Sequence, residues 1–153
     1  MKSRIRLALS GLVAAAAVAA AGTASAQFAK PEDAIKYRQA SFTLMSNHMG
    51  RLAAMARGAQ PFDAAAAQHS AKIVEMVSHL PWDAFPAGSS GGAAKLKGDP
   101  WKEAASFKKL QDDLKAQVAK LPAAAASLDG LKAQLGPTSG ACKACHDQFR
   151  EIR

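Results

Sequence analysis

The stretch Cys142-Lys143-Ala144-Cys145-His146, close to the end of the chain, decides how the rest of the sequence is interpreted. It has the pattern C-x-x-C-H and contains both cysteines of the 153 residues. Two thiols at this spacing can add to the two vinyl groups of one haem, and the following histidine becomes an axial ligand of the iron. The pattern therefore predicts one covalently attached haem c, with Cys142 and Cys145 as the attachment sites and His146 as the axial ligand.

Other uses of a C-x-x-C pair fit this sequence less well. A redox dithiol of the thioredoxin type needs a neighbouring βαβ unit, and no segment here shows one. A structural zinc ion needs four ligands, and the sequence has no second cluster of Cys and His. A disulfide across so short a loop would add little to the stability of a domain of this size.

The N-terminal segment has the pattern of a secretory signal. Three basic residues precede an apolar, alanine-rich run over residues 7–22, and Ala24-Ser25-Ala26 is a small-residue cleavage site. We expect a signal peptide over residues 1–26 and export to the periplasm. The alternative is a membrane anchor, because the run is close to spanning length. The cleavage site favours removal, which would leave the mature protein without a membrane attachment.

Removal of residues 1–26 leaves 127 of the 153 residues, enough for one compact domain over residues 27–153. It also subtracts three positive charges from the formal net charge of +8 and leaves +5. This modest basicity favours solubility and docking to acidic partners. No stripe of Lys and Arg is interleaved with aromatic residues, so nucleic acid is not an expected partner.

Four segments show the three-four spacing of amphipathic helices, and none alternates convincingly with the period of a strand. We expect the helices over residues 31–57, 63–80, 99–121 and 127–152. Pro31 suits a first helical position, Asp99 and Ser127 suit capping positions, and Pro81 and Pro122 limit the second and third helices. A loop rich in Gly, Ser and Pro joins these two.

The apolar positions give each helix an expected inward face. The first helix buries Ile35, Phe42, Met45, Met49 and Leu52. The second buries Phe62, Ala66, His69, Ile73, Met76 and Leu80. The third buries Phe107, Leu110, Leu114, Val118 and Leu121. On the fourth, which the pair Gly136-Pro137 should bend or interrupt, both cysteines lie on one seam with Leu128, Leu131, Leu135, Thr138, Phe149 and Ile152. The pattern predicts an all-α fold, an antiparallel up-down four-helix bundle with the haem in its interior.

The mature chain resembles the cytochrome c′ family, the four-helix class II c-type cytochromes, over its whole length. The resemblance rests on residues 142–150, on residues 27–39, and on Leu80-Pro81-Trp82-Asp83-Ala84-Phe85. Class I cytochromes c carry the haem motif near the N-terminus, with a methionine ligand downstream. Only seven residues follow His146 in this sequence, so we expect no ligand downstream of it.

The resemblance implies a five-coordinate, high-spin haem that binds nitric oxide and carbon monoxide, in a protein that is not an enzyme. Positional matching places Phe42 over the haem face opposite His146, where low-spin relatives have a methionine ligand. Phenylalanine has no lone pair to donate, so the sixth position would be vacant but crowded. Met45 lies three residues further along and could reach the iron if the helix shifted. We favour a packing role for it.

The resemblance also implies other haem contacts. Arg38 would pair with a propionate, and Arg150 would lie beside the imidazole of His146 on the same helical face. Gln39, Trp82 and Phe85 would also contact the haem. A ligand role is not expected for the remaining histidines, of which His69 falls on an apolar face and His48 and His79 near the surface.

Two further expectations concern partners. Family members often pair through their first two helices, so we expect a homodimer, with Leu44 and several alanines available for the contact. The alternative to gas binding is a periplasmic electron carrier with a six-coordinate, low-spin haem and a redox partner.

Overall fold

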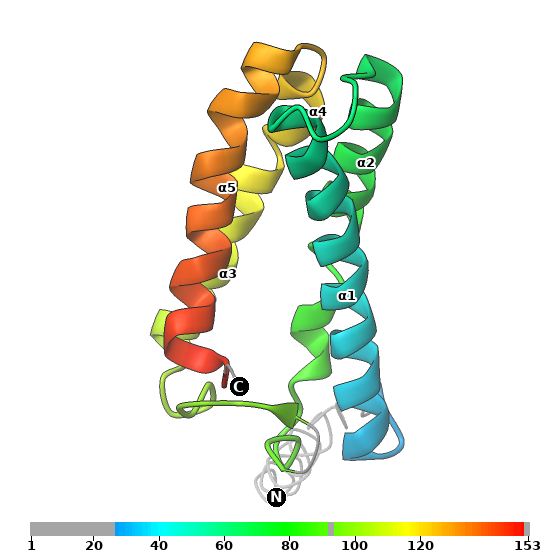
Figure 1. The fold of residues 1–153 in the computed structure, drawn as a ribbon. Coiled ribbons are helices and arrows are strands. Elements are labelled where there is room, and N and C mark those ends of the chain that lie inside the picture. Colours follow the sequence, from blue (N-terminus) through cyan, green and yellow to red (C-terminus); the bar gives the residue numbers. More distant parts are fainter. Residues whose placement is uncertain (1–26, 92–93, 152–153) are drawn as a thin grey trace, which may run out of the picture.

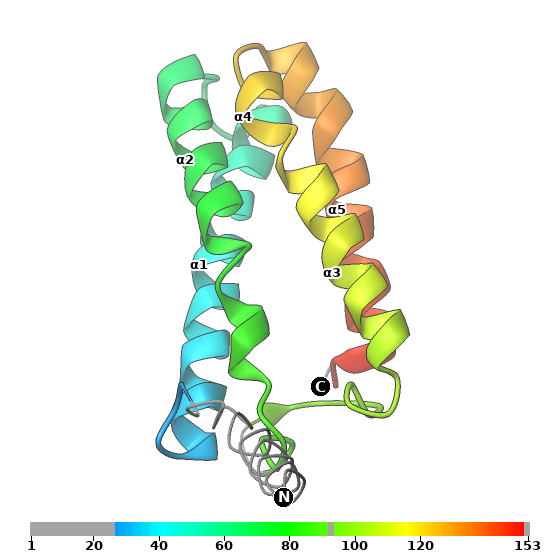
Figure 2. The ribbon, with the colours of Figure 1, turned by 180° about the vertical axis from the view of Figure 1, so that it is seen from behind.

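The computed structural model describes residues 27–91 and 94–151. The expected signal peptide and Ile152 lie outside these residues. The long helices are α1 (Pro31–Ala56), α2 (Ala64–Val77), α3 (Ala104–Val118) and α5 (Leu128–Phe149). A 3-10 helix, η1 (Pro81–Ala84), follows α2, and a four-residue helix, α4 (Leu121–Ala124), joins α3 to α5. Figures 1 and 2 show the predicted up-down antiparallel bundle, with α1 and α2 on one side and α3 and α5 on the other.

The ends of three helices agree with the sequence. Pro31 begins α1, and Gly58, just after its end, has a positive φ of 73°, which favours glycine. The side chain of Asp63 accepts a hydrogen bond from the N–H of Ala66 at 2.8 Å and caps α2. Ser127 caps α5 in the same way.

The expected inward face of α2 is wrong. The helix buries a narrower strip of small residues and valines instead, namely Ala67, Ser70, Ala71, Val74 and Val77. Met76 is 64% exposed and His69 is also exposed, so His69 is not a core histidine. Small side chains let α2 approach its neighbours closely, and the larger apolar side chains are left on the outside. The helix also ends three residues earlier than expected, before Pro81.

The third helix begins later than expected. Asp99 does accept hydrogen bonds from the backbone N–H groups of Trp101 and Lys102, each at 3.1 Å. These bonds close a turn, and α3 itself begins only at Ala104. Pro122 does not directly end α3, because it lies in the first turn of α4.

The fourth long helix, α5, is continuous through Pro137, so the expected interruption does not occur. Pro137 has no N–H to donate. In the next turn, the Oγ1 of Thr138, which is fully buried, donates to the carbonyl of Gln134 at 2.9 Å. The cysteines therefore lie on the same unbroken helix as the leucines of the core.

The core occupies the half of the bundle near α4. Its fully or almost fully buried aliphatic members include Leu52, Val74, Val118, Leu121 and Leu131. At the opposite end, the segment between η1 and α3 crosses the bundle close to the point where α5 ends (Figure 1). Within the described residues, no helix combines the length and the apolar character needed to span a membrane.

Candidate functional site

A cavity of about 1000 Å³ lies in the half of the bundle that the aliphatic core leaves open. This volume is at the upper end of the range of ligand pockets, about 300–1,000 Å³. Most of its walls come from α1, η1, α3 and α5, with Val74 of α2 and residues 94–96 of the loop before α3 completing them. All ten residues expected at a haem site line this one cavity, namely Arg38, Gln39, Phe42, Met45, Trp82, Phe85, Cys142, Cys145, His146 and Arg150.

The α5 wall carries the C-x-x-C-H motif. Neither Cys142 nor Cys145 is in a disulfide, and both are half-buried. Burial raises the pKa of the Cys142 thiol, and burial followed by the charge of Cys142 raises the pKa of Cys145 to about 11. The thiols are therefore protonated at neutral pH, and both border the space where a haem edge would lie. Burial also lowers the pKa of His146, which keeps its imidazole neutral and able to bind a metal.

The end of α5 is tied to the segment that precedes α3. Leu96 and Arg150 form an isolated antiparallel bridge, and the N–H of Lys97 donates to the carbonyl of Phe149 at 3.2 Å. Both Leu96 and Phe149 line the cavity. These bonds hold the end of α5, just after the motif, against the segment that precedes α3.

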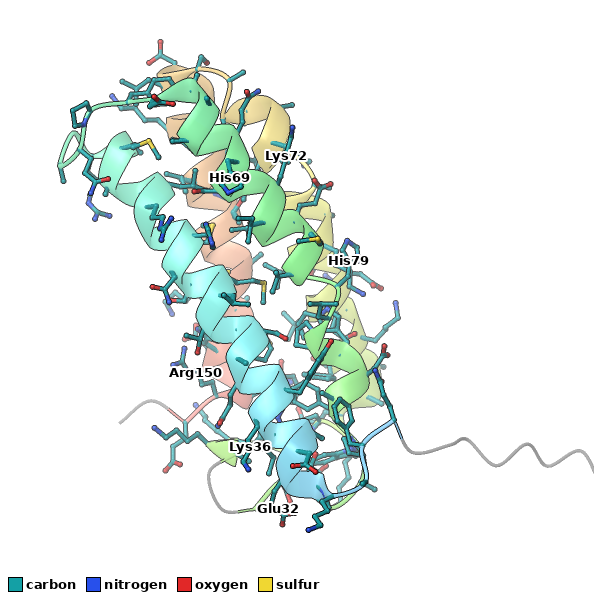
Figure 3. All side chains as sticks on the ribbon, turned by 90° about the vertical axis from the view of Figure 1, so that its right-hand side faces the viewer. Glu32, Lys36, His69, Lys72, His79 and Arg150 are labelled. Carbon is teal, nitrogen blue, oxygen red and sulfur yellow. The ribbon has the colours of Figure 1, made fainter. Side chains whose placement is uncertain are left out.

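Arg150 lies near His146 but not on the helix as expected. Its backbone is extended, with φ of −117° and ψ of 124°, and its N–H donates to the carbonyl of His146 at 3.1 Å. The side chain is exposed, and Figure 3 labels it at the end of α5. After burial, its positive charge is the next cause that lowers the pKa of His146, whereas Asp147 acts in the opposite direction.

The α1 wall places an aromatic ring and a thioether toward the cavity. The ring of Phe42 packs edge-on against Trp82, with centroids 5.8 Å apart. Met45 is 8% exposed and lines the same cavity. The positions i and i+3 thus share one face of α1, as expected from helical spacing.

Arg38 is a buried cation held by η1 and by the segment after it. It is 2% exposed; its Nη1 donates to the carbonyl of Ala84 at 2.9 Å and to Oγ of Ser89 at 2.7 Å, and its Nη2 donates to the Ser89 carbonyl. Its guanidinium lies 4.4 Å from the centroid of the Phe85 ring. None of these partners is a carboxylate. A buried cation of this kind favours a negatively charged group in the adjoining cavity.

Some residues of the cavity were not identified as site residues from the sequence. Phe107 and Phe149 were expected only as core residues, yet their rings are 5.1 Å apart at the cavity wall. Phe107 also meets the rings of Trp82 and Phe85. The three-four spacing on α3 and α5 could have marked both as facing the motif. No sequence pattern around Ala94 and Lys95 predicts that they line the cavity, because the path of the loop places them there.

These residues fit a haem c. The cavity is large, and aromatic side chains form much of its apolar wall. The two thiols and the imidazole all come from α5. The buried guanidinium of Arg38 suits a carboxylate substituent of the haem. The other histidines, His48, His69 and His79, do not line the cavity. The fold and the site together define a four-helix c-type cytochrome.

Comparisons with known proteins agree with this class. Residues 33–150 match the family described as Cytochrome C′. The chain is 48% identical over 128 residues to cytochrome c′ of Rubrivivax gelatinosus, which covers 82% of this chain and 99% of the relative. The chain belongs to the cytochrome c′ family. Membership implies haem c as the cofactor and confirms the expectation of a haem protein that is not an enzyme.

Solved structures of relatives share the fold. The crystal structure of cytochrome c′ from Rubrivivax gelatinosus has a TM-score of 0.78 and 48% identity, covering 82% of this chain and 100% of that one. A nitric oxide complex of a leucine-to-alanine variant from Alcaligenes xylosoxidans has a TM-score of 0.77 and 43% identity, covering 83% and 100%. A carbon monoxide-bound leucine-to-glycine variant of the same protein has a TM-score of 0.76 and 43% identity, covering 82% and 100%.

Proposed function

We propose that residues 27–153 form a periplasmic haem c protein that binds nitric oxide and carbon monoxide on the haem face directed toward α1. The observation that carries this proposal is the lining of one cavity by Phe42 and Met45 from α1 and by His146 from α5. When bound, the haem supplies an iron whose sixth coordination position can accept a diatomic gas.

The residues of α5 would hold the haem from one side. Cys142 and Cys145 would carry the two thioether bonds, and His146 would be the axial ligand. All three lie on neighbouring positions of α5, whose end is held by the bridge at Arg150, so the backbone that would present them to the haem is fixed before any gas arrives. Arg150 is close enough to His146 to influence its charge, which makes Arg150 a positioning residue for the ligand side.

Arg38 would hold a propionate of the haem. Its three hydrogen bonds to Ala84 and Ser89 engage three of the five N–H groups of a guanidinium, and a carboxylate can use others. The carboxylate would also supply the negative charge that Arg38 lacks among its described partners.

The ring of Phe42 would limit which ligands reach the sixth coordination position of the iron. Its ring contributes no lone pair, so it cannot take the sixth position, and its contact with Trp82 favours one ring position. A water molecule at this apolar spot would lack hydrogen-bond partners, whereas a neutral gas needs few. The relatives whose structures contain nitric oxide or carbon monoxide support this choice of ligand.

A second candidate is a low-spin electron carrier, and one observation favours it. Met45 is buried on the same cavity wall as Phe42, and a thioether can ligate iron. Its ligation would fill the sixth position and exclude gases, and the modest positive charge would then serve docking to an acidic redox partner.

Pairing through α1 and α2 is the third part of the proposal. The large hydrophobic residues that the described part of the chain exposes most are Leu44 at 48%, Met76 at 64% and Leu80 at 40%. All three lie on α1 or on α2 and the turn after it. Such a patch favours burial against a second copy of the chain.

The absorption spectrum of the reduced, haem-loaded protein tests the gas-binding proposal, recorded before and after addition of carbon monoxide. A five-coordinate, high-spin spectrum that shifts with the gas supports it. The same spectrum of the Met45→Leu variant separates the two candidates, since only the electron-carrier candidate expects this substitution to change the coordination number.

A further inference from the structure

The charged side chains that line the cavity are not balanced. Four of them are cations, namely Arg38, Lys95, Lys143 and Arg150, and one is a carboxylate, Asp147. The ammonium of Lys143 bonds this carboxylate, which lies one turn further along α5. Within the described residues, the other three cations have no carboxylate partner. The cavity therefore favours a ligand with more than one negative charge. A haem has two propionates, and the proposed contact with Arg38 accounts for one of them.

Lys95 lies in the segment between η1 and α3, which also supplies Ser89 to the guanidinium of Arg38. Figure 1 shows this segment crossing the end of the bundle opposite α4, close to the end of α5. The side chain of Lys95 is exposed and lines the cavity. Its ammonium makes no hydrogen bond or ion pair with another described residue. Its three N–H donors are thus available to an anionic ligand at the mouth of the cavity.

The backbone of Lys95 is held in a conformation that a lysine rarely adopts. Its φ is 50°, in the left-handed region, and within the described residues every other positive φ belongs to a glycine. Such a conformation persists where the surrounding structure holds it, and it is frequent beside ligands. Here the carbonyl of Lys95 accepts a hydrogen bond from the N–H of Glu151 at 3.0 Å. The next residue, Leu96, forms the bridge with Arg150. The position of Lys95 at the cavity wall is therefore fixed by the end of α5.

Covalent attachment would decide which edge of a haem lies beside this segment. The vinyl groups that react with thiols lie on two neighbouring pyrrole rings, and the propionates lie on the other two. Cys142 and Cys145 would hold one edge against α5, so both propionates would lie side by side along the opposite edge. A propionate beside Arg38 then brings the second one to the same edge. Lys95 is the lining cation that belongs to the segment bound to Arg38.

The other lining cations are placed for different contacts. Lys143 is paired with Asp147. The charge of Arg150 acts on the imidazole of His146, which is the expected axial ligand and lies away from the edge of the haem that carries the propionates. Lys95 therefore remains as the cation for the second carboxylate.

We propose that Lys95 binds the second propionate of the haem, so that Arg38 and Lys95 each neutralise one carboxylate at the same edge. This inference rests on the part of the proposed function that places the first propionate at Arg38. A neighbouring cation favours the ionised form of a carboxyl group. Each propionate should therefore have a pKa below about 4.3, the ordinary value of the glutamate side chain, which is chemically similar. Removal of one cation should raise the pKa of its own propionate and leave the other unchanged.

Infrared difference spectroscopy of the haem-loaded protein tests the inference, with isotopically labelled propionate carboxyl groups and decreasing pH. The fraction of each carboxyl that is protonated is measured for as long as the absorption spectrum shows the haem bound. Lys95→Gln should raise one of the two titration midpoints by about 0.5–1 pH unit, because the cation is exposed and partly screened by water. Arg38→Gln should raise the other by about 1 unit or more. Lys95→Arg keeps the charge and should titrate as the wild type does.

Lys97 provides a matched control in the same segment. It is also exposed, it lies two positions after Lys95, and it does not line the cavity. Lys97→Gln removes the same charge and should leave both midpoints in place. A shift of equal size in the Lys95→Gln and Lys97→Gln variants would show a general effect of charge and would overturn the inference.

Two further results separate this inference from the proposed function. A Lys95→Gln variant in which both propionates titrate as in the wild type overturns the inference, and so does a midpoint that moves with Arg150→Gln instead. Neither result affects the contact of Arg38, which the Arg38→Gln titration tests separately. Addition of carbon monoxide to the same samples tests gas binding. A protein that binds no gas but shows the selective Lys95 shift keeps this inference and loses the proposed gas binding.

Discussion

The ring of Phe42 meets the indole of Trp82 edge-on, with centroids 5.8 Å apart and planes inclined at 75°. This contact joins α1 to η1 at the wall of the cavity that the C-x-x-C-H motif of α5 also lines. The contact restrains the Phe42 ring, so a ligand that approaches from this side has to displace an aromatic ring that is already packed. The gas selectivity of the site then depends on a packing interaction, in addition to the chemistry of the iron.

Two substitutions of Phe42 should separate its steric obstruction of the gas from its inability to ligate the iron. Phe42→Ala removes the ring, and if displacement of the ring costs about 1.4 kcal/mol, carbon monoxide should associate about tenfold faster. Phe42→Met restores bulk but adds a thioether, and should give a six-coordinate, low-spin haem in a fraction of the molecules. Flash photolysis measures the first and the absorption spectrum the second. Equal association rates for wild type and Phe42→Ala would show that Phe42 does not guard the site.

The buried guanidinium of Arg38 should contribute to stability. Arg38→Gln removes donors from the carbonyls of Ala84 and Ser89 and should lower the free energy of unfolding of the haem-loaded protein by about 1–3 kcal/mol in urea. The control is Arg57→Gln, at an exposed helix end, where we expect a change within about 0.5 kcal/mol. Similar effects of the two substitutions would argue against the role of Arg38 in holding the segment after η1.

Two glycines of α5 should respond oppositely to alanine. A Cβ at Gly130 would lie 2.5 Å from the carbonyl oxygen of Ala124, so Gly130→Ala should destabilise the fold by about 1 kcal/mol or more. A Cβ at Gly140 would meet nothing within 4 Å, and Gly140→Ala should stabilise the helix by about 0.5–1 kcal/mol. Thermal unfolding of both variants measures the difference, and stabilisation by Gly130→Ala would contradict the observed turn between α4 and α5.

Pairing should depend on Met76. Met76→Lys places a charge in the exposed apolar patch and should raise the dimer dissociation constant by about tenfold or more at pH 7.5. Ala116→Lys adds the same charge at an exposed position of α3 and should leave the constant unchanged. Sedimentation equilibrium of the two variants measures both dissociation constants. Equal weakening by the two substitutions would exclude the α1/α2 face as the contact.

The sequence predicted the bundle and the α5 wall because both follow from local patterns. A C-x-x-C-H run fixes three neighbouring side chains on one helical turn, and Ser127 marks where that helix begins. The face of α2 that the sequence predicts is wrong, because the size of a hydrophobic side chain does not by itself indicate burial in this helix. The buried strip is made of small residues such as Ala67 and Ala71, while Met76 points outward.

Other features depend on contacts between distant parts of the chain, and no local pattern indicates them. The bridge between Leu96 and Arg150 joins segments 54 positions apart in number, and it takes Arg150 off the helix on which it was placed. Pro122 was interpreted only as a limit to α3, although a proline in the first turn also suits the start of a helix. The partners of Arg38 were likewise unpredictable, because they lie on a loop whose path the sequence does not specify.

We propose that Phe42 leaves the sixth coordination position of the haem vacant on the side away from His146. The most direct measurement is the resonance Raman spectrum of the reduced, haem-loaded protein, which reports the coordination number and the axial ligand together. We expect a five-coordinate, high-spin iron with a histidine ligand, whose spectrum changes when nitric oxide or carbon monoxide is added. A six-coordinate, low-spin spectrum that neither gas alters would contradict it.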